Sequence, residues 1–241
     1  VYGLKPTFDR VSRQGVHPAV SSLDCVGPFA MSVNMIETAM QIIDPSFHPL
    51  TDLAQAPKLA WLDVSADAVV IESIQNYLAN ANLTLTKVKS KWFDPAFEAG
   101  MQIINYENWQ AYAALTETGL VGADVNSRLL KAAQTTKDQV QQAEQIKANF
   151  KAEIDALLAQ FDALILPTLP QIPPKVSEAE NTVAFLNLTS LVRPFNLSGH
   201  PAISIPLQTA SGLPIGLQIV AKQNADEYLC AIAKYIVQAG Q

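Results

Sequence analysis

The chain has 241 residues, of which 49% are hydrophobic and only 16% are charged, and its formal net charge is −6. This length is sufficient for a buried core, whereas a negative chain without clustered Lys and Arg argues against a nucleic acid as a partner. No apolar run approaches the roughly 20 residues that span a bilayer, so we do not expect a membrane as a partner either.

The first predicted elements are short strands and two helices. Residues 1–30 are rich in Gly, Pro and Ser, which is typical of loops and short strands. After Ser32, apolar residues recur at helical spacing over residues 33–43. Residues 59–64 then predict a short buried strand, and residues 69–78 predict a second helix.

The middle of the chain predicts two more strands and two more helices. Residues 83–88 alternate apolar and polar side chains, as a half-buried strand does. A helix is predicted over residues 95–115. A long helix is predicted over residues 125–161, which are rich in Gln, Lys, Glu and Ala. Residues 162–167 predict a fully buried strand that enters a proline-rich loop ending near Lys175.

The last third of the chain predicts an antiparallel pair of strands between two helices. A helix is predicted over residues 183–192 and a final one over residues 226–238. Residues 202–206 and 216–220 are predicted to pair as strands across the turn at residues 210–212. Strands that alternate with helices, together with an antiparallel pair, indicate an α/β fold with a mixed sheet.

The cysteines and histidines indicate neither a disulfide framework nor a metal site. Cys25 and Cys230 lie far apart in apolar surroundings, which favours two buried free thiols in a reducing, cytoplasmic compartment. His17, His48 and His200 are isolated from one another, and no Cys/His group has the spacing of zinc ligands. We therefore expect no metal and no cofactor.

Two blocks of sequence resemble a known family. The first, over residues 3–30, is GLKPTFDRVSRQGVHPAVSSLDCVGPFA. The second, over residues 161–220, contains FDALILPTLPQIPP, RPFNLSGHPAISIP and GLPIGLQIV in that order. Both are similar to blocks of the amidase-signature family of hydrolases. The resemblance implies that residues 1–241 are the C-terminal portion of a single amidase-signature domain, with a mixed sheet flanked by helices on both faces.

The family's catalytic residues have no counterpart in this chain. The resemblance implies a Ser–cis-Ser–Lys mechanism, in which a base activates a serine hydroxyl that attacks the amide carbonyl. In the family these residues precede the block that starts here at Gly3, and Lys5 belongs to that block, so it does not match the catalytic lysine. We expect the catalytic residues upstream of Val1 and predict that this chain alone is inactive.

The resemblance also provides candidate substrate-binding residues. In the related protein of the glutamyl-tRNA amidotransferases, an acidic residue seven positions before the counterpart of Asn196 holds the amino group of glutamine. Thr189 occupies that position here, and residues 105–109 differ from that protein's Ser-Arg-Phe-Asp-Gly block. This disfavours tRNA-dependent amidation. Thr189, Phe195 and Trp109 are the predicted substrate-binding residues, for a small uncharged or aromatic amide.

Several polar residues in the two blocks are interpreted as structural. Asp24 follows two serines, where its carboxylate can accept backbone N–H groups. Asn196 and Ser198 flank the turn at Gly199 and are expected to fix it through side-chain hydrogen bonds. A Ser–Lys dyad within this chain is disfavoured, although three serines are available for one: Ser12, Ser21 and Ser22.

Two functions remain open from the sequence. The favoured one is an amidase that hydrolyses linear carboxamides through an acyl-enzyme; the alternative is a non-catalytic, amidase-like ligand-binding or regulatory module. The charged share lies below the roughly 25% of typical domains. Either the interior fraction is high, or a missing N-terminal segment or a second copy covers an open face. The expected ligand is a small-molecule amide.

Overall fold

The computed structural model describes residues 1–178 and 186–240. Within these residues, seven strands form one sheet in the order β2-β1-β6-β7-β5-β3-β4. The strands are β1 (Tyr2–Lys5), β2 (Phe29–Ala30), β3 (Leu59–Leu62), β4 (Leu85–Val88), β5 (Ala163–Pro167), β6 (Ala202–Gln208) and β7 (Pro214–Val220). Strand β3 is parallel to β4 and β5, whereas the remaining neighbours are antiparallel. The predicted mixed sheet is confirmed.

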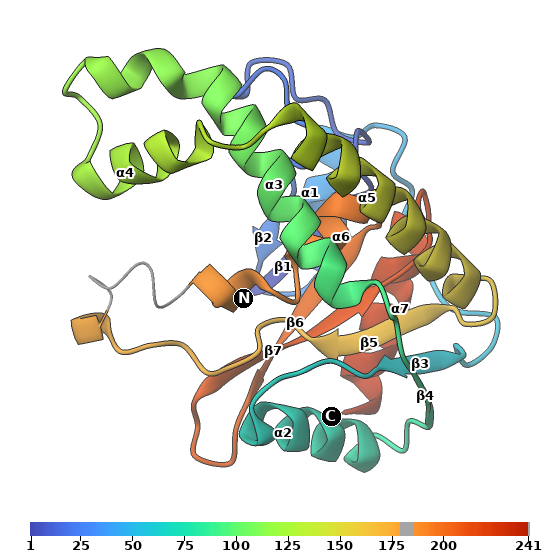
Figure 1. Ribbon diagram of the computed structural model, residues 1–241. Helices are drawn as coiled ribbons and strands as arrows, with labels where there is room; N and C mark the ends of the chain where they lie inside the picture. Colours follow the sequence, from blue (N-terminus) through green and yellow to red (C-terminus); the bar gives the residue numbers. More distant parts are fainter. Residues whose placement is uncertain (179–185, 241) are drawn as a thin grey trace.

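Helices cover both faces of this sheet, and 3₁₀ turns connect some of them (Figure 1). The helices are α1 (Val33–Ile43), α2 (Ala68–Asn80), α3 (Phe93–Tyr112), α4 (Ala123–Ala132), α5 (Lys137–Leu158), α6 (Arg193–Ser198) and α7 (Asp226–Ala239). The 3₁₀ turns are η1 (Ala113–Glu117), η2 (Val176–Glu178) and η3 (Leu186–Thr189). Figure 1 shows α4 projecting from the body of the protein beside the end of α3.

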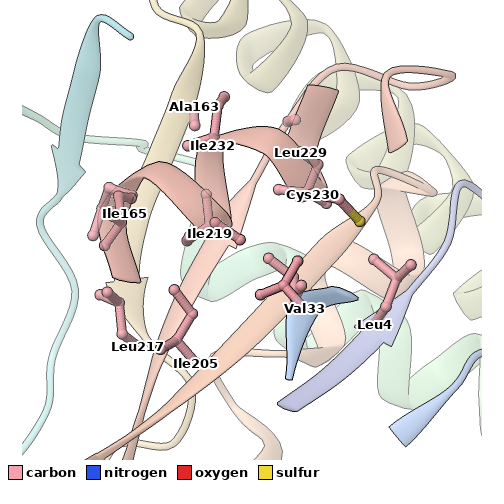
Figure 2. Packing of buried hydrophobic residues seen from close by; sticks show 14 of the residues in the cluster. Leu4, Val33, Ala163, Ile165, Ile205, Leu217, Ile219, Leu229, Cys230 and Ile232 are labelled. Atoms are coloured by element: carbon pink, nitrogen blue, oxygen red, sulfur yellow. The ribbon is translucent and has the colours of Figure 1, made fainter. Parts of the chain in front are cut away.

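The central strands are apolar on both sides because each side faces a separate core. In β3, Trp61 packs in the core formed with α1, α2 and α7, and Leu62 packs in the opposite one. In β5, Ile165 likewise packs in the first core and Leu164 in the opposite one. Successive side chains of a strand point to opposite faces of the sheet. Figure 2 shows α7 residues such as Ile232 above the isoleucines and leucines of β6 and β7.

Three phenylalanines organise the opposite core, which joins α3, α5 and α6 to the sheet. Phe93, Phe150 and Phe195 have ring centroids 5.8 to 6.0 Å apart, within the range of favourable aromatic pairs. All three side chains are buried, with exposed fractions of 5%, 0% and 0%. This cluster fixes the position of α6, which is only six residues long.

The predicted single helix over residues 125–161 is wrong, because the chain forms two helices there. Helix α4 ends at Ala132 and α5 begins at Lys137. Thr136 caps α5: its side chain accepts a hydrogen bond from the backbone of Gln139, whose side chain accepts one from the backbone of Thr136. This capping box stabilises a new helix start within a sequence of good helix formers.

The predicted helix over residues 183–192 is also wrong for residues 186–192, the part of it that the structure describes. Residues 183–185 lie outside the described residues, and the next four form the 3₁₀ turn η3. Helix α6 begins only at Arg193, with Pro194 in its first turn. Proline lacks the N–H that a helix interior needs but fits the first turn, so Pro194 marks a helix start.

An ion-pair network joins the first residues of the chain to α1 and α7. The Arg10 guanidinium pairs with Asp44 at 2.8 Å, with Asp226 at 3.0 Å and also with Glu227. The hydroxyl of Thr7 donates to Asp226, whose side chain is fully buried. Against the opposing effect of burial, hydrogen bonds from Ser46 and Arg10 lower the pKa of the Asp44 carboxyl, and those from Arg10 lower the pKa of the Glu227 carboxyl.

Candidate functional site

A cavity of about 320 Å³ lies where β1, β6 and β7 meet the loop before β2 and the segment that contains α6. We call it the sheet cavity. Its polar lining residues are Lys5, Cys25, Thr168, Asn196, Ser204 and Gln218. Most of its lining is apolar and includes Leu4, Val192 and Ile203. Apolar walls with a few convergent polar groups are typical of small-molecule sites.

The polar side chains of the sheet cavity are held by hydrogen bonds. Thr168 Oγ1, just after β5, lies 2.6 Å from Ser204 Oγ of β6. Asn196 Nδ2 donates to the carbonyl of Leu23 at 3.4 Å, and Gln218 Nε2 donates to the carbonyl of Leu191 at 3.0 Å. The Asn196 side chain thus bonds to the distant loop at Leu23 and not to the turn at Gly199 as expected, and it also lines the cavity.

Lys5 and Cys25 form a contact within this lining. Lys5 Nζ lies 3.0 Å from the carbonyl of Pro6 and 3.9 Å from Cys25 Sγ. Burial lowers the pKa of the Lys5 ammonium, although the neighbouring Cys25 and Asp226 favour its charged form. Burial likewise raises the pKa of the Cys25 thiol, so the thiol is not an activated nucleophile.

Two glycines allow the walls of the sheet cavity to approach each other. A Cβ atom on Gly27 would lie 2.0 Å from the carbonyl oxygen of Leu4. A Cβ atom on Gly216 would lie 2.6 Å from Thr168 Oγ1 and 2.8 Å from Ser204 Oγ. These distances are shorter than van der Waals contact, so a side chain at either position would force the walls apart.

None of the three predicted substrate-binding residues lines the sheet cavity. Thr189 is exposed at the end of η3, where its hydroxyl accepts a hydrogen bond from Arg193 at 2.6 Å. Trp109 is half-buried on α3. Phe195 is completely buried in the phenylalanine cluster, one residue before Asn196.

Two of the three loop serines, Ser12 and Ser21, brace their own segment. Ser21 Oγ accepts the backbone N–H groups of Leu23 and Asp24 at 3.2 and 3.1 Å. The expectation that the Asp24 carboxylate makes such bonds is wrong: its side chain is half exposed and lies 3.7 Å from Arg13. Ser12 Oγ accepts the N–H of Gln14. Ser22 Oγ is buried without a hydrogen-bond partner.

A chain of hydrogen bonds joins the buried Ser198 and His200 to the exposed Asp155, which the isolated positions of the histidines did not reveal. Ser198 Oγ lies 2.9 Å from His200 Nδ1, and His200 Nε2 lies 3.0 Å from Asp155 Oδ1. Burial lowers the pKa of His200 to about 4. The Ser–His–Asp order resembles that of a hydrolase triad. A substrate could not reach this serine, however, because the exposed fractions of Ser198 and His200 are only 3% and 0%. We interpret the chain as structural.

The described residues were also compared with the requirements of a metal site, a disulfide and a membrane-spanning helix. Across residues 1–178 and 186–240, no three His, Cys, Asp or Glu side chains form a group that could hold a metal ion. Both cysteines are free thiols; Cys230 is buried, whereas Cys25 is only partly buried. In the same part of the chain, no helix has both the length and the apolar character needed to cross a bilayer.

Comparison with curated proteins identifies a consistent set of relatives. The chain is 29% identical to a glutamyl-tRNA(Gln) amidotransferase protein of Synechococcus sp. (strain CC9605), over 100% of this chain and 60% of the relative. The corresponding amidotransferase protein of Saccharolobus solfataricus is 25% identical, over 98% and 59%. The chain therefore spans about 60% of the length of these relatives and matches their C-terminal portion.

Solved structures share the fold. A crystal structure described as an amidase has a TM-score of 0.87 at 23% identity, and the match covers 99% of this chain and 58% of that one. A 6-aminohexanoate cyclic dimer hydrolase complexed with substrate has a TM-score of 0.77 at 22% identity, with coverages of 99% and 60%. The model of the amidase family matches residues 1–60 and 58–230. The chain belongs to the amidase family, whose members share the amidase signature.

Proposed function

We propose that the complete protein is an amidase that hydrolyses linear carboxamides, and that this chain provides one wall of its substrate site. The observation that carries the proposal is the sheet cavity, whose Thr168, Ser204, Asn196 and Gln218 side chains are fixed around an apolar space in a member of the amidase family. Residues 1–241 would then form the C-terminal portion of a single domain.

The catalytic Ser–cis-Ser–Lys group is proposed to come from sequence upstream of Val1. Its serine oxygen attacks the carbonyl carbon, and the serine proton passes through the base to the nitrogen that leaves as ammonia or an amine. Water then attacks the acyl-enzyme, which releases the carboxylic acid and restores the serine. Backbone N–H groups near the nucleophile stabilise the oxyanion. This chain alone is proposed to be inactive.

The proposed substrate is a small amide that is uncharged or aromatic. The name of the curated relatives raises the alternative of tRNA-dependent amidation. Thr189 disfavours it, since a threonine cannot pair with the ammonium of glutamine as a carboxylate can. Thr189 and Trp109, which lie outside the sheet cavity, are proposed to contact the substrate beyond it. Phe195 is proposed to act from the core by fixing Asn196 on α6.

A covering segment fits the apolar surface beside the sheet cavity. Phe29 in the edge strand β2 is 80% exposed and Met31 is 71% exposed. Met35 and Ile42 of α1 are also exposed. Adjacent exposed apolar side chains at a sheet edge tend to be covered. We propose that the upstream segment, or a second copy, covers this surface.

The test is labelling of the product of the complete reading frame with a fluorophosphonate probe, followed by peptide mass spectrometry. An adduct on a serine upstream of Val1 supports the serine amidase. An adduct on Ser12, Ser21 or Ser22 refutes the proposed mechanism. Absence of any adduct, in protein that is folded by circular dichroism, favours the non-catalytic ligand-binding module.

A further inference from the structure

A second and larger cavity lies between the loop of residues 17–20 and the helices α3 and α5. Its volume is about 660 Å³, within the range of roughly 300–1,000 Å³ that small-molecule sites occupy. It shares no lining residue with the sheet cavity. We call it the helix cavity.

The lining of the helix cavity combines apolar, aromatic and acidic groups. Ile103 and Val140 contribute apolar surface, and Tyr106 and Tyr112 contribute two aromatic rings. Glu107 and Glu144 contribute two carboxylates. His17 also lines the cavity, whereas none of its described lining residues is lysine or arginine. Aromatic faces and carboxylates both attract cations, so the lining is complementary to positive charge.

The carboxylate of Glu107 is held in place. Its two oxygens lie 3.1 Å from the backbone nitrogen of Ser22. The loop that forms the opposite wall is also fixed, because Arg13 donates to the carbonyls of Pro18 at 2.7 Å and Ser21 at 3.1 Å. The bonds of Glu107 hold the loop against α3, and those of Arg13 fix the conformation of the loop itself.

Glu144 is the adjustable acidic group of the cavity. It is exposed on α5, and its Oε2 lies 3.4 Å from Lys147 Nζ one turn later. An exposed pair of this kind contributes little stability, so the Glu144 carboxylate is available to a cationic ligand. Glu107 and Glu144 approach the cavity from different helices, α3 and α5.

We propose that the helix cavity binds a small organic cation, an aryl- or alkylammonium with an apolar body. The apolar body contacts Ile103 and Val140, and the ammonium lies against the faces of Tyr106 and Tyr112 near the two carboxylates. A purely apolar ligand of the same shape gains no charge interaction with the carboxylates, and an anion is repelled by them. The site thus selects by charge as well as by shape.

The test is calorimetric titration of the product of the complete reading frame with benzyltrimethylammonium and, separately, with benzyl alcohol. The first probe carries a positive charge on an apolar body, whereas the second keeps the benzyl group without charge. We expect one saturable site for the cation and at least about tenfold weaker binding of benzyl alcohol. Glu144→Gln and Tyr112→Leu should each weaken cation binding about 3- to 10-fold.

Glu72→Gln is the matched control, since Glu72 is exposed on α2 and lines neither cavity. It should leave the affinity unchanged. Because Glu144 is exposed, Glu144→Gln decides the question even if Tyr112→Leu does not fold. Equal affinities for the two probes, undiminished binding by Glu144→Gln, or no binding of the cation overturns the proposal. Binding is measured without turnover, so its result is independent of whether a serine is labelled by fluorophosphonate.

Discussion

His200 Nε2 lies 3.0 Å from Asp155 Oδ1, which joins a residue two positions before β6 to the helix α5, 45 positions earlier in the chain. The imidazole is fully buried, and its other nitrogen contacts Ser198. Since α5 covers the sheet and α6 lies beside it, this contact fixes the segment that presents Asn196 to the sheet cavity. It is a structural connection close to the proposed substrate site.

The first prediction concerns pH. Folding lowers the pKa of His200 from 6.5 to about 4 because the ring is buried, so the unfolded chain binds its proton more readily. The free energy of unfolding should therefore fall as the pH decreases from about 6.5 to about 4, by about 3 kcal/mol from this residue. Urea unfolding at pH 7, 5.5 and 4 measures this decrease in the free energy of unfolding. His200→Asn should flatten the profile; an unchanged slope in that variant contradicts the assignment.

The second prediction concerns the Arg10 network. Arg10→Met removes the cationic partner of the fully buried Asp226, which keeps its hydrogen bonds from Thr7, and removal of one member of a buried ion pair typically costs about 3–5 kcal/mol. The free energy of unfolding by denaturant should decrease by that amount. Arg128→Met is the matched control because Arg128 makes an exposed pair with Asp124 within α4. The prediction is wrong if the two variants are equally stable.

The third prediction separates two roles for Phe195. Because the ring is buried against Phe93 and Phe150, Phe195→Ala should lower the free energy of unfolding by about 3–5 kcal/mol. Phe29→Ala, at an exposed ring, should change it far less. Denaturant titration of both variants measures the difference. Full stability of Phe195→Ala together with a raised KM would instead indicate direct substrate contact.

The fourth prediction tests Thr189 within the proposed amidase. Thr189→Val removes a hydroxyl at the end of η3, so KM for a small aromatic amide should rise about 3- to 10-fold with kcat unchanged. Steady-state kinetics of the complete protein measures this. Thr118→Val, at an exposed threonine just after η1, is the control and should behave as the unmodified enzyme. A change in kcat alone would point away from ground-state binding.

Much of the fold could be predicted because its elements depend on local pattern. The unbroken apolar run of β5 and the alternation of β4 identify strands directly, and Ser32 and Asp44 bound α1 as predicted. The break before α5 was missed because the residues on both sides favour helix. Its signal was Thr136 with Gln139 three positions later.

The site was less predictable because its contacts join distant parts of the chain. The family resemblance indicates a substrate pocket, yet the sheet cavity combines residues from β1, α6, β6 and β7. Neither the partner of His200 nor the ion pairs of Arg10 follow from local spacing. The resemblance does identify the Asn196 segment, and the structure places this side chain in the cavity lining.

The pairing of β1 with β6 has a consequence for synthesis in the cell. Lys5 lies opposite Ala202 in the sheet, so its strand partner leaves the ribosome about 200 residues later. At roughly 5–20 residues per second, the edge of β1 that faces β6 waits on the order of 10–40 seconds unpaired, whereas β2 can pair with the other edge much earlier. During that interval the nascent chain exposes a strand edge that is open to misassociation, and binding by a chaperone would protect it.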